Sequence, residues 1–305
     1  MVQLKVNEEQ VGIRIDKFVS DAFPDLSRSY IQKLIKEGLI TVNNKAVKSN
    51  YKVNSEDVLE IMEPEPSIPD IIAENIPLEI LYEDADILII NKPKGMVVHP
   101  SAGHYSGTLV NALMYYCKDD LSGINGVLRP GIVHRIDMDT TGSLLVCKND
   151  FAHNHIAEQL KVHSITRIYH AIVHGVLKED EGTINAPIGR HPIDRKKMSI
   201  NHQNGKEAIT HYRVLKRFRN FTYIECRLET GRTHQIRVHM ASIHHPLLGD
   251  NVYGPNKSQY KLQGQTLHAK TIGIQHPRTG EYIEVDAPLP EYFSDLLTKL
   301  EYSVQ

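Results

Sequence analysis

Two short segments of this 305-residue chain concentrate side chains that could do chemistry. They read His134-Arg-Ile-Asp-Met-Asp-Thr-Thr-Gly142 and Glu229-Thr-Gly-Arg-Thr-His-Gln-Ile-Arg-Val-His-Met240. Each puts charged groups beside apolar, strand-forming residues, where a charge is costly to bury unless it is paired. Taken singly, each segment is better explained as a structural turn with a buried ion pair. Taken together, they offer one carboxylate, Asp137, and several guanidinium groups that could hold it ionised.

The rest of the chain lacks the signatures of the common cofactor-dependent and hydrolytic enzymes. It has no phosphate-binding glycine loop followed by Lys-Ser or Lys-Thr, no dinucleotide fingerprint after a strand and no Gly-x-Ser-x-Gly. Among its 17 histidines, His239, His244 and His245 lie close together but lack the spacing of a zinc site, and the three cysteines are far apart. We therefore expect no metal and no cofactor.

Composition indicates a soluble, cytoplasmic protein. The sparse cysteines have no CxxC spacing, which fits a reducing compartment. The N-terminus lacks the pattern of a signal peptide, and no apolar run reaches the ~18 residues that suggest a membrane span. The formal net charge is −2, so a surface that binds nucleic acid must be local.

The first sixty residues predict a small unit of two helices and several short strands. Ser27 is a suitable N-cap for the second helix, and Gly38 is suited to end it. Asn43 and Asn44 predict a tight turn between two strands. The expected elements are helices over 14–23 and 28–37 and strands over 39–42, 45–47 and 53–61.

This unit is basic although the whole chain is nearly neutral. Residues 28–52 contain six basic side chains and one acidic side chain, Glu37. A solvated helix face would explain this pattern, but clustered Lys and Arg also suit the phosphates of RNA. The order of helix, Ser-Arg helix, Gly, strand, Asn turn and strand resembles the αL RNA-binding motif of the ribosomal S-four protein. The candidate RNA-binding residues are Arg28, Lys33, Lys36, Lys45 and Lys48.

Prolines mark the end of this unit. Glu63-Pro-Glu-Pro-Ser-Ile-Pro-Asp70 can form neither a helix interior nor a central strand. We assign residues 1–62 to an RNA-binding domain, 63–76 to a stiff linker and 77–305 to a catalytic domain. Residues 150–162 of the last domain have the pattern of a helix, and short apolar runs predict strands over 87–90, 143–146, 170–173 and 221–228. No regular βαβ alternation runs through this domain, which favours an α+β fold on a largely antiparallel mixed sheet.

Several ordered motifs between about Leu81 and Pro290 resemble those of pseudouridine synthases of the RluA/RluD type, whose RluD-like branch usually carries an N-terminal αL module. The motifs are Asn91-Lys-Pro-Lys-Gly95, His134-Arg-Ile-Asp137 with Thr141-Gly142, Arg167-Ile-Tyr-His-Ala171 with Gly175, Gly231-Arg-Thr-His-Gln-Ile-Arg237-Val-His, His245-Pro-Leu-Leu-Gly-Asp250, and Leu267-His-Ala269 with His276-Pro277. The chain departs from the family in one turn, where Thr140-Thr-Gly-Ser143 replaces the frequent Thr-Ser-Gly-Leu.

This resemblance implies an enzyme that isomerises uridine to pseudouridine in RNA without a cofactor. It implies Asp137 as the catalytic carboxylate and Arg237, in preference to Arg232, as its ion-pair partner. Whether Asp137 acts first as a nucleophile or as a base stays open. The resemblance also implies that the Tyr169 ring stacks on the uracil and that its hydroxyl could assist removal of the C5 proton.

Further substrate contacts follow from the same comparison. Arg135 would lie on the same side as Asp137 if both are on a strand, where it could contact a phosphate or fill the gap left by the flipped base. The other expected substrate-binding residues are His134, Arg232, His234 and Leu267, and a basic group that could grip the RNA backbone is Arg190, Arg195, Lys196 and Lys197. The family branch implies 23S ribosomal RNA or the assembling large subunit as partner, with no membrane contact, and a monomer is the default expectation.

Two other interpretations stay open. An RNA-associated factor could keep this fold without activity, although the intact set of Asp137, Tyr169 and Arg237 argues against it. A carboxylate hydrolase acting on a nucleoside usually needs a second catalytic carboxylate. The only near neighbour is Asp139, which would lie on the same side as Asp137 if the strand continues.

Overall fold

The computed structural model describes residues 2–23, 26–62, 71–100, 104–118, 120–124, 129–194, 197–255 and 260–302. The chain forms two compact units, Met1–Ile68 and Pro69–Gln305. Residues 63–70 of the predicted linker lie outside the described residues. The prediction extends this linker to residue 76, but Ile71 is buried in the core of the second unit and the Asn111 side chain donates to the Ile72 carbonyl. The second unit therefore includes residues that the sequence assigned to the linker.

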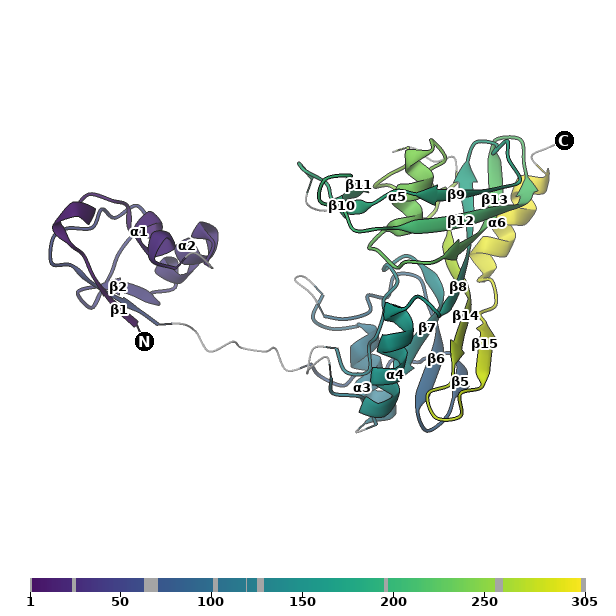
Figure 1. The fold of residues 1–305 in the computed structure, drawn as a ribbon, viewed down its shortest axis with the longest axis horizontal. Coiled ribbons are helices and arrows are strands. Elements are labelled where there is room, and N and C mark those ends of the chain that lie inside the picture. Colours follow the sequence, from purple (N-terminus) through teal and green to yellow (C-terminus); the bar gives the residue numbers. More distant parts are fainter. Residues whose placement is uncertain are drawn as a thin grey trace. The chain divides into compact units, whose positions relative to one another are not determined.

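The first unit combines two helices and a four-stranded antiparallel sheet around one apolar core (Figure 1). The strand order is β1-β4-β2-β3. The elements are β1 (Val2–Lys5), a 3-10 turn (Glu8–Gln10), α1 (Ile15–Ala22), α2 (Arg28–Lys36), β2 (Ile40–Val42), β3 (Lys45–Ala46) and β4 (Val58–Ile61).

Local sequence explains most of these boundaries. The Ser27 hydroxyl accepts from the Tyr30 N–H at 3.3 Å, which confirms the predicted N-cap of α2. Gly38, after the end of α2, has a φ of 74°, and Asn43 and Asn44 have φ values of 50° and 62° in the turn between β2 and β3. These left-handed conformations suit Gly and Asn, as the sequence indicated.

The sequence missed one strand of this unit and misplaced the start of another. Strand β1 was not predicted, because its residues alternate weakly and only its pairing with β4 defines it. Strand β4 begins at Val58 rather than at residue 53. The Asp57 carboxylate accepts from the Asn54 N–H at 2.8 Å, which holds the preceding residues in a turn.

The second unit is built on one large mixed sheet in which strand order is β5-β6-β7-β14-β8-β13-β12-β9, with β15 paired to β14. Every pairing in this sheet is antiparallel except the short parallel contact between β7 and β14. The predicted α+β fold on a largely antiparallel sheet is therefore confirmed. The strands are β5 (Ile80–Glu83), β6 (Ile87–Lys92), β7 (Thr141–Cys147), β8 (Thr166–His174), β9 (Glu181–Asn185), β12 (Ile209–Arg217), β13 (Phe221–Leu228), β14 (Leu267–Gln275) and β15 (Tyr282–Asp286), and a separate hairpin is formed by β10 (Ile188–Arg190) and β11 (Met198–Ile200).

Helices cover both faces of this sheet (Figure 1). They are α3 (Leu109–Cys117), α4 (Asp150–Lys161), α5 (Gln235–Ser242) and α6 (Glu291–Tyr302). In β6, Leu88 packs in the core that includes α3, whereas its neighbour Ile89 packs in the core that includes α4. Strands buried on both faces read as continuous apolar runs, which is why the sequence revealed β6 and β7 so clearly.

The core that contains α3 continues along the same face of the sheet to α5. Tyr169 of β8, Leu228 of β13 and Leu267 of β14 contribute side chains to it. On the opposite face, Phe293 of α6 packs against Ile172 of β8. Among the described helices, none has both the length and the apolar character that a bilayer crossing needs.

Candidate active site

Asp137 lies in an irregular loop, residues 133–140, directly before β7. Arg135 was expected to share a side with Asp137 if both were on a strand, but residues 134–137 form no strand. The Thr140 N–H bonds back to the Asp137 carbonyl at 3.0 Å and closes a turn. Gly142, which follows, has a φ of 106°, and a Cβ there would lie 2.2 Å from the Ala269 carbonyl oxygen. The Thr-Gly of this motif therefore lets β7 approach β14 closely and fixes where the Asp137 loop ends.

The Asp137 carboxylate is paired with Arg237, as the resemblance implied. Arg237 Nη1 lies 2.8 Å from Asp137 Oδ2, and the two side chains are 6% and 20% exposed. The same guanidinium makes a second, bidentate contact with Asp250, through Nε at 2.7 Å and Nη2 at 3.0 Å. Arg237 thus bridges two carboxylates, one completely buried and one open to the pocket.

Charge pairing outweighs burial in this triad. Burial opposes the charged form of Arg237, but the carboxylates of Asp250 and Asp137 raise its pKa above the usual value. Burial also opposes ionisation of Asp250, yet the contacts from Arg237 and the backbone N–H groups of Val252 and Tyr253 lower its pKa. Arg237 therefore stays charged and presents a fixed donor to Asp137.

Arg237 is on helix α5 rather than beside a strand, so the strand-like interpretation of its segment is wrong. Six of the eight residues of α5 are buried, which removes the amphipathic pattern by which a helix is recognised. The Gln235 side chain fixes the start of the helix. Its oxygen accepts from the Arg232 N–H at 2.9 Å and its nitrogen donates to the Ile209 carbonyl at 2.9 Å.

Lys92, at the end of β6, holds the other side of the Asp137 loop. Its side chain is completely buried, and its ammonium donates to the carbonyls of Pro93, Met96 and Met138 at 2.8–2.9 Å. Burial lowers the pKa of Lys92 to about 7, against the opposing effect of the nearby carboxylates. The motif Asn91–Gly95 contains Lys92, but its sequence does not indicate a role for this residue. The contact of Lys92 with the Met138 carbonyl joins β6 to the residue after Asp137.

His234 faces Asp137 from the residue before α5. Its Nε2 lies 3.8 Å from Asp137 Oδ2, and its Nδ1 lies 2.7 Å from the Tyr253 hydroxyl. That hydroxyl accepts from the Met198 N–H of β11 at 2.8 Å, so its own proton is free to donate to Nδ1. In a neutral His234 the proton is therefore on Nε2 and points toward Asp137. Burial lowers the pKa of His234, which favours this neutral form.

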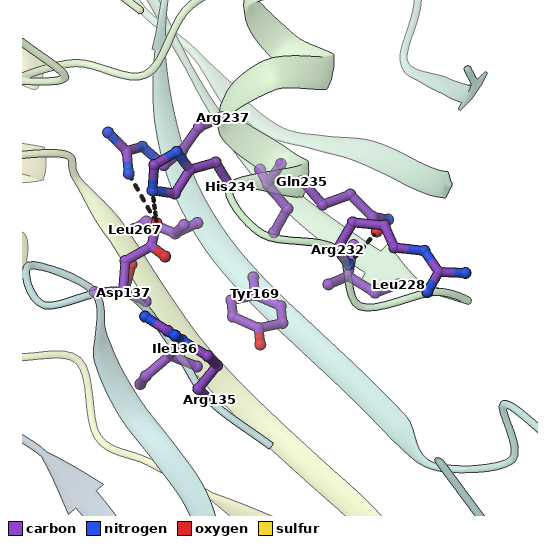
Figure 2. Close-up of a pocket in the computed structure, with 12 residues that line it drawn as sticks. Arg135, Ile136, Asp137, Tyr169, Leu228, Arg232, His234, Gln235, Arg237 and Leu267 are labelled. Atoms are coloured by element: carbon purple, nitrogen blue, oxygen red, sulfur yellow. Dashed lines mark hydrogen bonds and ion pairs between the residues drawn. The ribbon is translucent and has the colours of Figure 1, made fainter. Parts of the chain in front are cut away.

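A cavity of about 50 Å³ lies against the Asp137 side chain (Figure 2). Tyr169, Leu228 and Leu267 supply its apolar walls from three adjacent strands. Burial raises the pKa of Tyr169, so its phenol remains protonated at neutral pH. The other residues that line the cavity are Arg135, Ile136, Thr140, Arg232, His234, Gln235, Ile236 and Arg237. An apolar slot with one carboxylate and several N–H donors suits a flat, uncharged ring that carries carbonyl groups.

Most of the predicted site residues line this cavity. Two residues do not: His134, a predicted substrate-binding residue, and Asp139, the possible second carboxylate. His134 does not line this cavity; its Nε2 accepts from the Leu145 N–H at 2.9 Å and ties the loop to β7. Asp139 also lies outside it, because its side chain packs against Gly264. The expectation that Asp139 shares a side with Asp137 is therefore wrong, which removes the second carboxylate that a hydrolase would need.

The predicted RNA-binding residues of the first unit are exposed but differently engaged. Arg28 contacts the buried Asp16 at 3.0 Å, and Lys33 lies 3.8 Å from Glu37. Lys36 and Lys48 line a groove of about 860 Å³ between the end of α2 and the residues after β3. Lys45 is exposed on β3 itself. In the second unit, Arg190 is the last residue of β10 and Lys197 directly precedes β11, and Arg195 and Lys196 lie outside the described residues.

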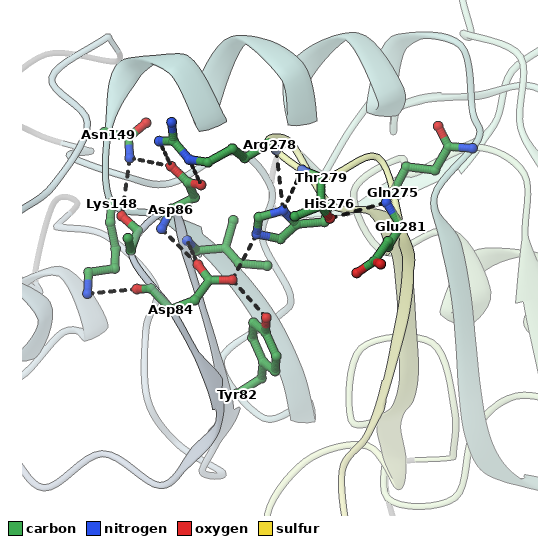
Figure 3. A network of polar contacts seen from close by, with 12 residues as sticks. Tyr82, Asp84, Asp86, Lys148, Asn149, Gln275, His276, Arg278, Thr279 and Glu281 are labelled. Carbon is green, nitrogen blue, oxygen red and sulfur yellow. Dashed lines mark hydrogen bonds and ion pairs between the residues drawn. The ribbon is translucent and has the colours of Figure 1, made fainter.

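Within the described residues, one group offers metal-ligand atoms close together, namely Asp84, Asp86 and His276 (Figure 3). Arg278 already contacts both oxygens of Asp86, at 2.6 and 2.7 Å, and His276 Nε2 contacts Asp84 at 2.8 Å. These contacts join the turn between β14 and β15 to the turn between β5 and β6. The carboxylates of this group are therefore already paired with side chains that hold the two turns together, and we call Asp84, Asp86, His276 and Arg278 the clamp.

Comparison with known proteins adds two family matches. Residues 86–242 match the RNA pseudouridylate synthase family, and residues 13–59 match the S4 domain. The first match includes Asp137, Tyr169 and Arg237; the second includes both helices of the first unit.

Relatives along the whole chain bear similar names. An uncharacterised RNA pseudouridine synthase of Bacillus subtilis is 53% identical over 98% of both chains. The ribosomal large subunit pseudouridine synthase D of Zymomonas mobilis is 46% identical over 95% of this chain and 94% of its own. Among solved structures, human RNA pseudouridylate synthase domain containing 1 is 25% identical, with a TM-score of 0.58 over 79% of this chain and 98% of its own.

Replacing Asp250 with Asn tests whether Arg237 needs its second carboxylate. We expect turnover on RNA to fall by about 10- to 100-fold, because a misplaced Arg237 leaves Asp137 poorly oriented. RNA affinity should change little, and the free energy of unfolding should fall by about 3 kcal/mol, since a buried pair loses one charge. Single-turnover rates, binding titrations and thermal unfolding measure these effects, with the exposed Asp180→Asn as control. Unchanged turnover at a lowered melting temperature would give Asp250 a structural role alone.

The clamp around Asp86 predicts a dependence of stability on acid. Contacts with Arg278 are the main cause that lowers the pKa of Asp86 from 3.8 to about 2. The carboxylate therefore contributes its full stability above pH 3.8 and loses it as the pH falls toward 2. Asp86→Asn should lower the free energy of unfolding at neutral pH by about 1–3 kcal/mol and flatten its decline in acid. Denaturant unfolding at several pH values measures both; equal acid sensitivity of the two proteins would contradict the assignment.

Proposed function

The chain belongs to the RNA pseudouridine synthase family, and on that premise we propose that Asp137, Arg237 and Tyr169 form its active site and that its substrate is large-subunit ribosomal RNA. The enzyme converts uridine in RNA to pseudouridine. One observation carries the assignment of the site: the Asp137 carboxylate lines an apolar cavity while Arg237 holds it from behind at 2.8 Å.

The reaction breaks the C1′–N1 bond of uridine, turns the uracil and forms a C1′–C5 bond. No atom is gained or lost, so the site needs a group that acts on the ribose or the ring and then releases it. An ionised Asp137 can do this either as a nucleophile or as a base. Arg237 donates to one oxygen of this carboxylate and fixes its orientation at the cavity wall.

Tyr169 acts mainly through its ring in this proposal. Its raised pKa disfavours a phenolate, and its ring forms a wall of the cavity together with Leu228 and Leu267. A uracil between these apolar groups can rotate without losing fixed hydrogen bonds. The target base must first leave its stack, which costs roughly a few kcal/mol and less in loops. Arg135, exposed at the mouth, is placed to occupy the gap in the RNA.

Ribosomal RNA is the proposed target because several relatives that align with nearly the whole chain are named for the large ribosomal subunit. The S4 domain supports an additional grip on RNA through Lys36 and Lys48, which line one groove. Cytoplasmic location and a monomeric state belong to the same proposal. An inactive RNA-binding factor is the second candidate, and the paired Asp137 argues against it.

Mapping pseudouridine in ribosomal RNA tests the target. Cells without this gene should lose pseudouridine at specific large-subunit positions, and a plasmid copy of the wild type should restore them. The Asp137→Asn copy should not, because a neutral amide can neither attack nor take a proton, although the protein should remain folded. Unchanged maps without the gene would reject the ribosomal target. Full restoration by Asp137→Asn would reject the proposed mechanism.

The groove of the S4 domain predicts a change in the salt dependence of RNA binding. Each phosphate contact that is lost lowers the slope of log Kd against log salt by about 1. Lys36→Gln with Lys48→Gln should therefore lower the slope by about 2, whereas Lys17→Gln on α1 should not change it. Equal slopes for the double variant and the wild type would show that this groove does not contact RNA.

A further inference from the structure

A second, larger cavity adjoins the candidate active site. It measures about 340 Å³ and shares Arg135, Tyr169, Leu228 and Arg232 with the cavity that holds Asp137. In the view of Figure 2, Leu228 and Arg232 lie beyond Tyr169 as seen from Asp137. A ligand seated against Asp137 can therefore extend past the Tyr169 ring into this second cavity, and none of the reaction steps derived above uses it.

The wall of this cavity is strongly cationic. It includes Arg135, Arg167 and Arg232, and no Asp or Glu is among its described lining residues. Within the described parts of the chain, none of these three guanidinium groups lies within 4.0 Å of a carboxylate. His134 adds no charge at neutral pH, because burial lowers its pKa to about 4. Three guanidiniums without a counter-ion indicate a site for an anion.

Arg167 is the unusual member of this wall. Its side chain is only 7% exposed, its Nη2 donates to the Glu229 carbonyl at 2.9 Å, and its Nε has no hydrogen-bond partner. A buried arginine held by one carbonyl and left without a carboxylate is costly unless a ligand completes it. Burial accordingly lowers the pKa of Arg167, and the charge of Arg232 acts in the same direction.

The backbone is shaped to keep Arg167 in this position. A Cβ at Gly231 would lie 2.4 Å from Arg167 Nη1, so only glycine leaves room for the guanidinium. The next residue, Arg232, donates from Nε to the Glu207 carbonyl at 2.8 Å, which fixes the start of its guanidinium. The Gly-Arg pair of the second polar segment thus places two cations side by side along one cavity wall.

We propose that this cavity binds one phosphodiester group of the substrate RNA, next to the uridine that enters the Asp137 cavity, chiefly through Arg167 and Arg232. Guanidinium groups match phosphate oxygens in shape and charge. A nucleotide whose base lies against Tyr169 carries a phosphate on each side of its ribose, and the shared walls allow one of them to reach the second cavity. This inference rests on the proposed function and assigns Arg167 to the binding of substrate.

A chemical double-mutant cycle tests the contact. Short RNAs that contain the mapped target carry a single uncharged methylphosphonate either 5′ or 3′ of the uridine, or at a distant linkage. For the wild type, one flanking substitution should weaken binding or single-turnover rate by about 10- to 100-fold, as expected for a hydrogen bond to a charged group. Arg232→Gln should be weaker by a similar factor on unmodified RNA and insensitive to that same methylphosphonate.

Further variants separate the contact from structural effects. Arg167→Gln should lose sensitivity at the same linkage, and thermal unfolding reports whether this buried substitution also damages the fold. Arg227→Gln is the matched control, since Arg227 is an exposed arginine one residue before Leu228 and outside both cavities. It should retain the full wild-type sensitivity. Inorganic phosphate should compete with RNA for the wild type more strongly than for Arg232→Gln.

Two results would overturn the proposal. One is a wild type that is indifferent to both flanking methylphosphonates while converting unmodified RNA; the other is an Arg232→Gln enzyme that is as sensitive to them as the wild type. Because the RNA used is whichever one mapping identifies, a non-ribosomal target would reject the ribosomal assignment and still leave this contact open to the same measurement.

Discussion

The charge of Arg237 is the constraint on which the candidate active site depends. A guanidinium that is 6% exposed must be paired, and the structure pairs it with Asp250 on two nitrogens and with Asp137 on the third. Asp250 alone already neutralises Arg237, so Asp137 receives a strong donor without having to be buried itself. This division leaves one carboxylate completely buried and one, still 20% exposed, at the cavity, where the proposed mechanism needs it.

The same constraint explains why distant segments must fold together before the site exists. The loop of residues 133–140 is held by Lys92 through the Met138 carbonyl and by Arg237 through the Asp137 carboxylate. Helix α5 is in turn fixed by Gln235, whose side chain donates to the carbonyl of Ile209 in β12 of the sheet. The large antiparallel sheet supplies the remaining wall, because Tyr169, Leu228 and Leu267 project from neighbouring strands onto one face. The result is an apolar slot with the Asp137 carboxylate against one of its walls.

Sequence patterns succeeded where local physics dominates. The Ser27 cap, the Asn43-Asn44 turn and the strand over residues 221–228 were all predicted, because capping, left-handed turns and alternating burial leave direct marks in the sequence. They failed where tertiary contacts override those marks. Helix α5 is buried on nearly all sides and therefore lacks a helical stripe, and β1 is a strand only because β4 pairs with it. The sequence left open whether a strand runs through Asp137, because the turn there is closed by a backbone contact that no residue type specifies.

By itself, the sequence determined the family and the class of reaction and singled out Asp137 as the candidate carboxylate, because ordered motifs specify which residue types occur and in which order. It could also pair Asp137 with Arg237 by resemblance. Only the tertiary structure decided that Asp250 shares this arginine, that Asp139 and His134 point elsewhere, and that Arg167 lies buried without a carboxylate. Each of these facts depends on which atoms meet across strands, loops and helices that lie between 11 (His134 and Leu145) and 125 (Asp139 and Gly264) residues apart, and spacing along a chain does not fix such distances.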